Sequence, residues 1–418
     1  MLAAGKQNGV AGDEGGASRA ECSVVQLPGI LMKFDLIIVG GGLAGAALAV
    51  ALRGSALRIA LIEHAQPRRP SGWDSRVYAY SPASVRFLGE LGVWVHLDHG
   101  RLMPVSEMHI HGDAGGELRF SAYESGLPEL AWIGESGLVH VEIWESLRRQ
   151  HNVELFCPAT PAELEPGPQG VTLKLADGRV LQAALVVGAD GRDSWVRTQA
   201  SMPAAVIPYG ERGVVANFRC ERPHRGTAFQ WFRADGVLAW LPLPAGMMSM
   251  VWSTPDAHAD ELLALEPEAF CAHVASAGDH ALGQLELVGD RTAFPLRLMR
   301  VNEVVRARVA LVGDAAHAIH PLSGHGINLG FQDAKALADV LVALPSWQDP
   351  GDLAVLRRYA RGRAEEPFLL QYTTHALSRL FGRRDPLLSA LRNAGLNLAG
   401  QVPVIKNALV RYAANGRF

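Results

Sequence analysis

The chain has 418 residues, of which 49% are hydrophobic and 19% are charged, and its formal net charge is −3 at pH 7. Such a composition excludes a disordered chain, and the weak negative charge gives no general attraction to nucleic acid. The four cysteines are too far apart in the sequence to suggest a metal site, a redox dithiol or a disulfide framework. We therefore expect a globular protein of a reducing cytoplasm, with no bound metal and no nucleic-acid partner.

The first segment, residues 1–31, is rich in glycine and alanine and has no hydrophobic period, which predicts a disordered leader. Met32 stands directly before the first apolar run and could be the biological start. Residues 36–52 carry no charge, but their four glycines disfavour a membrane helix. A strand, a tight turn and a buried helix explain the same apolar run better.

Parallel strands are predicted by short, continuously apolar runs, the first two at residues 36–39 and 59–62 with an alanine- and leucine-rich helix between them. Similar runs occur at residues 184–187 and 309–312. The strands of one sheet are therefore dispersed along the chain. They define a discontinuous first domain made of residues 32–101, 130–200 and 300–345.

A second domain is predicted from residues 102–129 and 201–299, where short aromatic and β-branched segments are broken by proline, glycine and aspartate. This pattern is typical of an antiparallel sheet. Beyond residue 326 the chain is mostly helical, and residues 346–418 are expected to form C-terminal helices. The fold class is thus α/β: a Rossmann-like domain with a mixed, mostly parallel sheet, an inserted domain on an antiparallel sheet, and a helical C-terminal region.

The first strand is followed by a glycine-rich turn that opens a helix. Gly40 permits the tight turn, Gly42 lets the backbone approach a pyrophosphate, and Gly45 allows the helix to pack closely on the strand. The N–H groups at Leu43 and Ala44 would then point at the phosphates from the helix N-terminus. The motif predicts a dinucleotide site.

Glu63 ends the second strand, where a carboxylate can accept hydrogen bonds from both ribose hydroxyls of an adenosine. A 2′-phosphate would be repelled there, so we expect the bound dinucleotide to be FAD or NAD rather than NADP.

Two later motifs also follow strands: Asp190-Gly191, and Gly313-Asp314 with a loop rich in glycine and proline that runs into a helix. Alone, Asp-Gly after a strand is an ordinary turn. Together with the later motif it predicts a flavin, because Asp314 can bind ribityl hydroxyls. The N-terminus of the new helix, at Gly326, Ile327 and Asn328, would face the isoalloxazine ring.

These three motifs, in this order and spacing, resemble those of FAD-dependent aromatic hydroxylases of the p-hydroxybenzoate hydroxylase type, over nearly the whole chain from Phe34 onward. Residues 313–317, 319–322 and 326–330 look most like those of bacterial ubiquinone-biosynthesis ring hydroxylases. The resemblance implies that NADH or NADPH reduces FAD, that O2 adds to the flavin C4a, and that the resulting hydroperoxide attacks an electron-rich phenol ring.

The resemblance also assigns roles to individual residues. Arg76, in Asp74-Ser75-Arg76, would contact flavin or nicotinamide, although an exposed loop salt bridge is the alternative. His140 stands where relatives often have a flavin-contacting glutamine, and a plain surface histidine is the alternative. The loop at the reacting edge of the flavin is expected to hold Pro321, Gly324 and His320, the last either as a base or as a backbone-bonded loop histidine.

The substrate surface is expected on the antiparallel sheet, where aromatic side chains and flexible methionines suit a large apolar ring. An ordinary sheet core is the alternative reading. Which face meets the flavin cannot be read from the alternation of side chains. The candidate residues are Trp231, Trp240, Pro242, Met250 and Trp252.

The C-terminal segment, residues 379–418, has seven basic residues and one acidic residue, with leucines interleaved at near-helical spacing. It is expected either to rest on an anionic membrane surface, to contact a biosynthetic complex, or to pack as a helix pair on the domain. The leading hypothesis is hydroxylation of a polyprenylated phenol in ubiquinone biosynthesis by a cytoplasmic, peripheral protein. A hydroxylase of a small soluble aromatic acid and a non-catalytic flavin-binding subunit are the alternatives.

Overall fold

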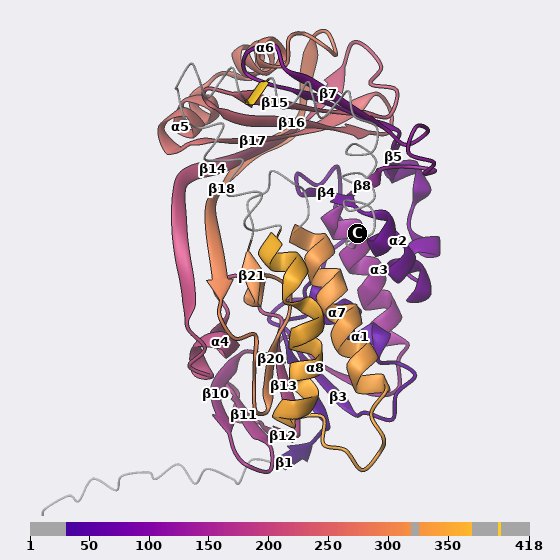
Figure 1. Ribbon diagram of the computed structural model, residues 1–418, viewed down its shortest axis with the longest axis vertical. Coiled ribbons are helices and arrows are strands. Elements are labelled where there is room, and N and C mark those ends of the chain that lie inside the picture. Colours follow the sequence, from indigo (N-terminus) through magenta and orange to yellow (C-terminus); the bar gives the residue numbers. More distant parts are fainter. Residues whose placement is uncertain (1–30, 319–325, 370–391, 394–418) are drawn as a thin grey trace, which may run out of the picture.

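The computed structural model describes residues 31–318, 326–369, 392 and 393. In Figure 1 the sheets and helices of the dispersed first domain form the lower part of the molecule, and a large sheet with two helices on it forms the upper part. Two long strands, β14 (Ala204–Cys220) and β18 (Leu285–Val301), run side by side through both parts.

The lower part is built on a six-stranded sheet of order β19-β20-β13-β2-β3-β9, in which all neighbours but β19 and β20 are parallel. The four strands predicted from apolar runs are all present in it, within one residue of the expected bounds, so the mixed, mostly parallel sheet is confirmed. The strands are β2 (Leu36–Val39), β3 (Ile59–Ile62), β9 (Val153–Phe156), β13 (Leu185–Gly188), β19 (Val305–Arg306) and β20 (Val309–Leu311).

Two different layers cover this sheet, which is why its strands are apolar on both faces. Leu36 and Ile38 belong to a core shared with the helices, whereas Ile37 and Val39 belong to a core shared with a second, four-stranded sheet. The helices are α1 (Leu43–Ala51), α2 (Pro82–Glu90), α3 (Ser136–Arg148), α7 (Gly326–Val342) and α8 (Leu353–Arg363). The covering strands are β1 (Leu31–Lys33), β10 (Pro161–Pro166), β11 (Val171–Leu175) and β12 (Val180–Ala183), and α4 (Trp195–Gln199) lies beside them.

The upper part is an eight-stranded, mostly antiparallel sheet of order β21-β18-β14-β17-β16-β15-β6-β7. Its remaining strands are β6 (Glu107–His111), β7 (Glu117–Ser121), β15 (Thr227–Arg233), β16 (Gly236–Leu243), β17 (Met247–Pro255) and β21 (His317–Ala318). Helices α5 (Asp256–Ala264) and α6 (Pro267–Ala277) cover its outer face, at the top of Figure 1. The antiparallel sheet is thus also confirmed.

A three-stranded sheet lies between the two parts, against the inner face of the large sheet. It consists of β4 (Val77–Tyr80), β8 (Ala131–Glu135) and β5 (Met103–Val105). Val77, Val105 and Ile133 share a core with Leu243 and Met247 of the large sheet. The chain therefore enters the large sheet at β6, a few residues later than the expected boundary at residue 102. Between these elements lie the short 3₁₀ helices η1 (Trp94–His96) and η2 (His99–Arg101).

The aromatic residues expected to meet the substrate lie on the outer face of the large sheet, away from the lower part. Trp231, Trp240, Met250 and Trp252 share one buried core with α5 and α6, and Pro242 is buried on the same face opposite Met248. The Trp231 indole donates to Asp279 Oδ2 at 3.0 Å. The expectation that these five residues contact substrate is therefore corrected to the alternative, an ordinary sheet core. Alternation showed that they share a face but could not show which one.

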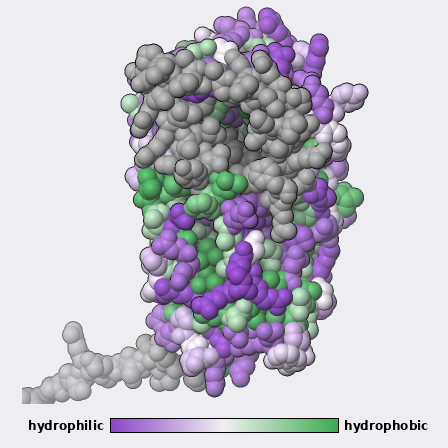
Figure 2. All heavy atoms as spheres, in the orientation of Figure 1, coloured by the Kyte–Doolittle hydropathy of each residue, from purple (hydrophilic) through white to green (hydrophobic). Residues whose placement is uncertain are grey.

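Among the described residues, no helix has the length and apolar composition that crossing a bilayer requires. The face drawn in Figure 2 mixes hydrophobic and hydrophilic side chains over α8 and the neighbouring strands. Most of the basic C-terminal segment lies outside the described residues, and only Arg392 and Asn393 belong to the structure.

Replacing Trp240 with alanine should destabilise the protein by about 3–5 kcal/mol, because the cavity left under α6 cannot be refilled. Trp240 is fully buried. Trp347→Ala is the matched control, since Trp347 is 82% exposed and should change the free energy of unfolding by less than about 0.5 kcal/mol. Urea denaturation followed by circular dichroism measures both. Equal effects of the two substitutions would contradict the packing described here.

Candidate active site

Three loops leave the carboxyl ends of neighbouring parallel strands at the same edge of the six-stranded sheet. The register places Val39 beside Gly188, and Gly188 beside Leu311, so the turns after β2, β13 and β20 must meet. These turns carry the three motifs singled out in the sequence. Ligands of such sheets bind at the carboxyl ends of the strands.

The glycine turn after β2 fits so closely against the turn after β13 that side chains are excluded from it. Gly40 has φ +104°, and a Cβ atom there would lie 2.3 Å from the carbonyl oxygen of Ala189. A Cβ atom at Gly45 would lie 2.0 Å from the Gly40 oxygen. At Gly42, by contrast, a Cβ atom would meet no protein atom within 4 Å. Gly42 therefore faces open space, as a ligand-facing glycine should.

The N-terminus of α1 is available for an anion. No side chain caps it at Gly42, and its first turn contains no acidic residue. The first N–H groups of the helix, among them those of Leu43 and Ala44, are not used by its own hydrogen bonds, and they carry the positive end of the helix dipole. A pyrophosphate is the kind of ligand that such a terminus binds.

Glu63, just after β3, is held beside this turn and is almost fully buried. Its Oε2 accepts from the Gly41 N–H at 2.6 Å, and its Oε1 accepts from the His64 N–H at 2.8 Å. The carboxylate is thus fixed at the end of the strand where the adenosine ribose was expected.

His140 and Trp144, one turn apart on α3, both bind the carbonyl group of the glycine turn. His140 Nε2 donates to the Gly41 carbonyl oxygen at 2.7 Å, and Trp144 Nε1 donates to the same oxygen at 2.8 Å. Burial lowers the pKa of His140, so its ring stays neutral near pH 7. His140 is therefore not a plain surface histidine. Trp144 was not expected from the sequence, because it carries no motif.

The turn after β13 supplies a second acid. Asp190 Oδ2 accepts from the Val196 N–H at 3.0 Å, whereas its Oδ1 is buried without a partner in the described part of the chain. Gly191 has φ +82°, which favours glycine. The free carboxylate oxygen marks a position where a ligand hydroxyl can donate.

The turn after β20 begins with Gly313, at φ +61°, whose N–H donates to Asp333 Oδ2 at 2.9 Å. A Cβ atom there would lie 3.2 Å from the Ala44 Cβ, so this turn packs directly on the start of α1. Asp314 follows in the short helix η3 (Gly313–Ala315), with its side chain exposed. Desolvation by the surrounding protein nevertheless raises its pKa, and Arg192 partly opposes this.

The loop that carries Arg76 is fixed by its backbone, while the Arg76 side chain is 73% exposed. Asp74 accepts from the N–H groups of Arg76 and Gly137. Asn217, on the inner face of the large sheet, donates to the Asp74 carbonyl at 3.0 Å. The Arg76 guanidinium lies 4.0 Å from Asp74, so the loop ion pair is weak and the arginine remains available to a ligand.

The Asn328 side chain connects two helices. Its Oδ1 accepts from Ser81 N–H at 2.9 Å and from Ser84 Oγ at 2.7 Å, and its Nδ2 donates to the Ala79 carbonyl at 2.9 Å. The side chain thus ties α7 to the start of α2. Gly326 and Ile327 begin α7 as expected. Pro321, Gly324 and His320 lie outside the described residues.

The residues present fit an FAD. An uncapped helix N-terminus meets an open glycine, a fixed carboxylate lies at the next strand, and a buried, unpartnered carboxylate oxygen lies in the adjacent turn. Asp314 lies at the same edge of the six-stranded sheet, in the turn after β20.

Comparison with known proteins agrees with this geometry. A family model described as FAD binding domain matches residues 33–369. Ubiquinone hydroxylase UbiL of Rhodospirillum rubrum is 35% identical over 91% of this chain and 89% of its own. The 3-demethoxyubiquinol 3-hydroxylase of Escherichia coli is 33% identical over 91% of this chain and 98% of its own.

The chain belongs to the family of FAD-dependent aromatic monooxygenases. The p-nitrophenol 4-monooxygenase of Pseudomonas putida has the same fold, with a TM-score of 0.76 at 21% identity over 93% of this chain and 100% of that one. The resemblance to the p-hydroxybenzoate hydroxylase type is thereby confirmed, and with it FAD as the cofactor and a nicotinamide as the co-substrate typical of the class.

Within this monooxygenase, the inner face of the large sheet looks toward the Arg76 loop and the three-stranded sheet. Its alternate positions include Asn217 of β14, Ala239 and Leu241 of β16, and Ser249 and Val251 of β17. Asn217 Oδ1 and Ser249 Oγ are both buried without a partner in the described structure, on directly paired positions.

The Gly42→Ala substitution should separate flavin binding from folding. The new methyl group meets no protein atom but enters the space over the helix N-terminus, so we expect FAD affinity to fall at least about tenfold. The melting temperature of the apoprotein should stay nearly unchanged. Gly54→Ala is the control, because a Cβ atom there also meets nothing. Fluorescence titration of the apoprotein with FAD measures the effect, and unchanged affinity in Gly42→Ala would count against the assignment.

Proposed function

We propose that the protein hydroxylates the ring of a polyprenylated phenol in ubiquinone biosynthesis, with FAD, NADH or NADPH, and O2. The observation that carries the proposal is the similarity along about nine-tenths of the chain to relatives named for hydroxylation in the ubiquinone series. Bound FAD supplies the redox chemistry.

The residues of this chain hold the flavin rather than react. In the proposal, the N-terminus of α1 and Gly42 bind the pyrophosphate, Glu63 binds the adenosine ribose, and Asp190 and Asp314 bind hydroxyls further along the molecule. Arg76 reaches the flavin or the nicotinamide from its exposed loop. His140 supports the glycine turn, and Pro321, Gly324 and His320 border the reacting edge.

The substrate ring is assigned to the inner face of the large sheet. Ala239, Leu241 and Val251 provide apolar contact there. The unpartnered Asn217 Oδ1 can accept a hydrogen bond from a phenolic hydroxyl, and Ser249 Oγ can accept from it or donate to it. No lysine or arginine occurs at the inner-face positions between residues 213 and 217, 237 and 243, or 247 and 253 in the described sheet. These positions therefore offer neutral contacts, which suit a prenylphenol, whereas the carboxylate of a small aromatic acid would have to reach a cation outside them, such as Arg76.

A cytoplasmic protein must meet a polyprenylated substrate at a membrane surface or within a complex, and the basic segment at residues 379–418 remains the proposed contact. One of its arginines already has an internal partner. Arg392 pairs with Asp113 at the turn between β6 and β7, and Asn393 Oδ1 accepts from the Gly116 N–H at 2.9 Å. The segment is therefore anchored to the large sheet at this point.

Product analysis with labelled oxygen tests the proposal. The FAD-loaded protein is incubated with NADPH or NADH and either a prenylphenol in detergent or a soluble aromatic acid such as salicylate. We expect substrate-stimulated nicotinamide oxidation and one labelled oxygen atom in the prenylphenol alone. Hydroxylation of salicylate alone would favour the soluble-acid alternative, and no stimulation by any phenol would favour a non-catalytic flavin protein.

A further inference from the structure

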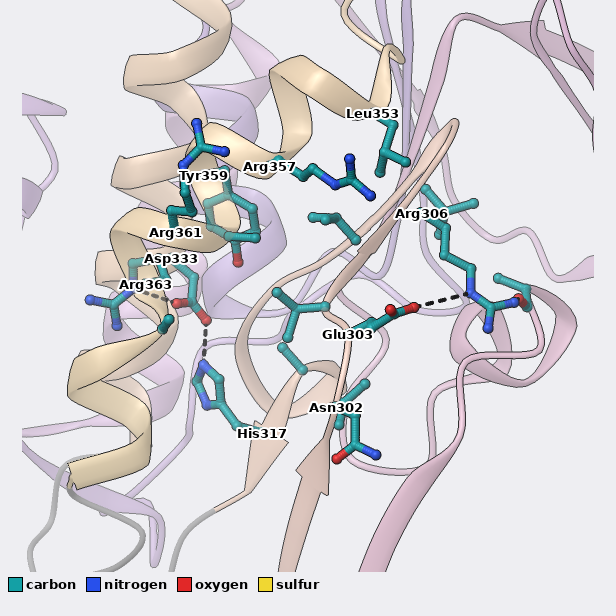
Figure 3. A pocket seen from close by; sticks show the side chains of 18 of the residues that line it. Asn302, Glu303, Arg306, His317, Asp333, Leu353, Arg357, Tyr359, Arg361 and Arg363 are labelled. Atoms are coloured by element: carbon teal, nitrogen blue, oxygen red, sulfur yellow. Dashed lines mark hydrogen bonds and ion pairs between the residues drawn. The ribbon is translucent and has the colours of Figure 1, made fainter.

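A fully buried carboxylate lies directly behind the turn after β20. Asp333 of α7 is 0% exposed and accepts three hydrogen bonds. Gly313 N–H and His317 Nε2 donate to its Oδ2 at 2.9 and 2.7 Å, and Arg363 Nε donates to its Oδ1 at 2.8 Å. Figure 3 shows the Asp333 side chain between those of His317 and Arg363, with dashed lines for its interactions with both.

The partners of Asp333 come from separate parts of the fold. His317 lies on β21, just after the flavin-binding turn, and Arg363 lies at the end of α8. Arg363 Nη1 also donates to Glu366 at 2.7 Å. On the same helix, the Tyr359 hydroxyl donates to the Leu311 carbonyl, at the end of β20, at 2.8 Å. Helix α8 is therefore fastened to both sides of the Gly313 turn.

The charges of Asp333, His317 and Arg363 stabilise one another. Burial alone would raise the pKa of Asp333, but the charges of His317 and Arg363 lower it overall. Burial alone would lower the pKa of His317, but Asp333 raises it overall through its charge and hydrogen bond. Each of the buried charges of Asp333, Arg363 and protonated His317 thus has a hydrogen-bonded partner of opposite sign, as buried charges require.

A cavity of about 1170 Å³ opens beside this cluster. Asp333, His317 and Arg363 line part of it, together with Arg357 and Phe368. In Figure 3, Arg357 extends from α8 toward Leu353 and does not reach Asp333. The cavity therefore gives small solutes a route to the network, and Arg357 is a neighbour that shares the cavity but not the hydrogen bonds.

We propose that Asp333, His317 and Arg363 form a positioning network that fixes the Gly313–Asp314 turn, so that helix α8 sets the affinity of the protein for FAD. None of the three is a catalytic residue, because each acts through the turn. The proposal rests on FAD binding by the family and not on which phenol is hydroxylated.

The physical reason is the cost of an unpaired buried charge. Without Arg363, the fully buried Asp333 loses a charged donor, and it must either take up a proton or draw the neighbouring groups toward it. Either response weakens the acceptor that holds the Gly313 N–H. Lysine at this position keeps the charge but cannot bind Asp333 and Glu366 together, because it lacks the planar fork of donors.

Single variants, one double variant and a chemical rescue test the network. We expect Arg363→Ala and Asp333→Asn each to weaken FAD binding to the apoprotein at least about tenfold, and Arg363→Lys to give an intermediate loss. In the double variant Arg363→Ala/Asp333→Asn, the fold loss of FAD affinity should be smaller than the product of the two single fold losses, because the pair acts as a unit. Arg357→Ala is the matched control and should bind FAD like the unmodified protein.

Guanidinium chloride at low, non-denaturing concentration should restore FAD affinity to Arg363→Ala, since the missing group can enter from the cavity, but should not help Asp333→Asn. A merely misfolded variant would not be rescued. Absence of rescue in a folded Arg363→Ala protein, or additive losses in the double variant, would overturn the proposal.

The pH dependence of the stability of the apoprotein gives an independent readout. The charged groups that face His317 are Asp333 of α7, Asp314 of η3, and Arg363 beyond Asp333. Arg300 of β18 is the residue opposite His317 in the pairing of β18 with β21. Because the pKa of His317 is raised in the folded protein, its contribution to the free energy of unfolding is fully present below about 6.5 and is lost as the pH rises through the raised value. The free energy of unfolding of the apoprotein should fall over that range. The fall should move to lower pH in Asp333→Asn and should vanish in His317→Gln. An identical midpoint in the unmodified protein and in Asp333→Asn would contradict the network.

Discussion

The site depends on one steric constraint: three turns at the carboxyl ends of β2, β13 and β20 approach one another more closely than side chains allow. Gly40 touches the Ala189 carbonyl, and Gly313 lies against Ala44. Because Gly40 lies against backbone and Gly313 lies against the small side chain of Ala44, the turns bring free N–H groups and acidic side chains to a single edge. The parallel register of the three strands makes the approach possible, and glycine makes it close enough for a dinucleotide.

Glycine permits this arrangement but does not stabilise it. The turns are stabilised by hydrogen bonds from other elements: His140 and Trp144 donate to the Gly41 carbonyl, and Asp333 accepts from the Gly313 N–H. Buried, fully bonded polar groups of this kind fix a conformation more than they add stability. The residues that face the ligand can then remain exposed, as the Arg76 side chain is.

The sequence predicted the parts of this site that follow from local pattern. Strands buried on both faces give continuous apolar runs, so β2, β3, β13 and β20 were located nearly to the residue. Alternation in the large sheet was equally clear, yet Trp240 lies on the outer face, because a period of two does not tell which face a helix will cover. Asp333, His317 and Arg363 have no shared spacing, so their network follows only from the packing of α7 and α8.

A crystal structure of the protein with bound FAD is the measurement that tests this account most directly. It should show one flavin dinucleotide extended along the strand edge, with its pyrophosphate over the N-terminus of α1 beside Gly42 and its ribityl chain at Asp314. A flavin bound elsewhere, or a pyrophosphate displaced from that helix terminus, would contradict the claim that the three turns together form the cofactor site.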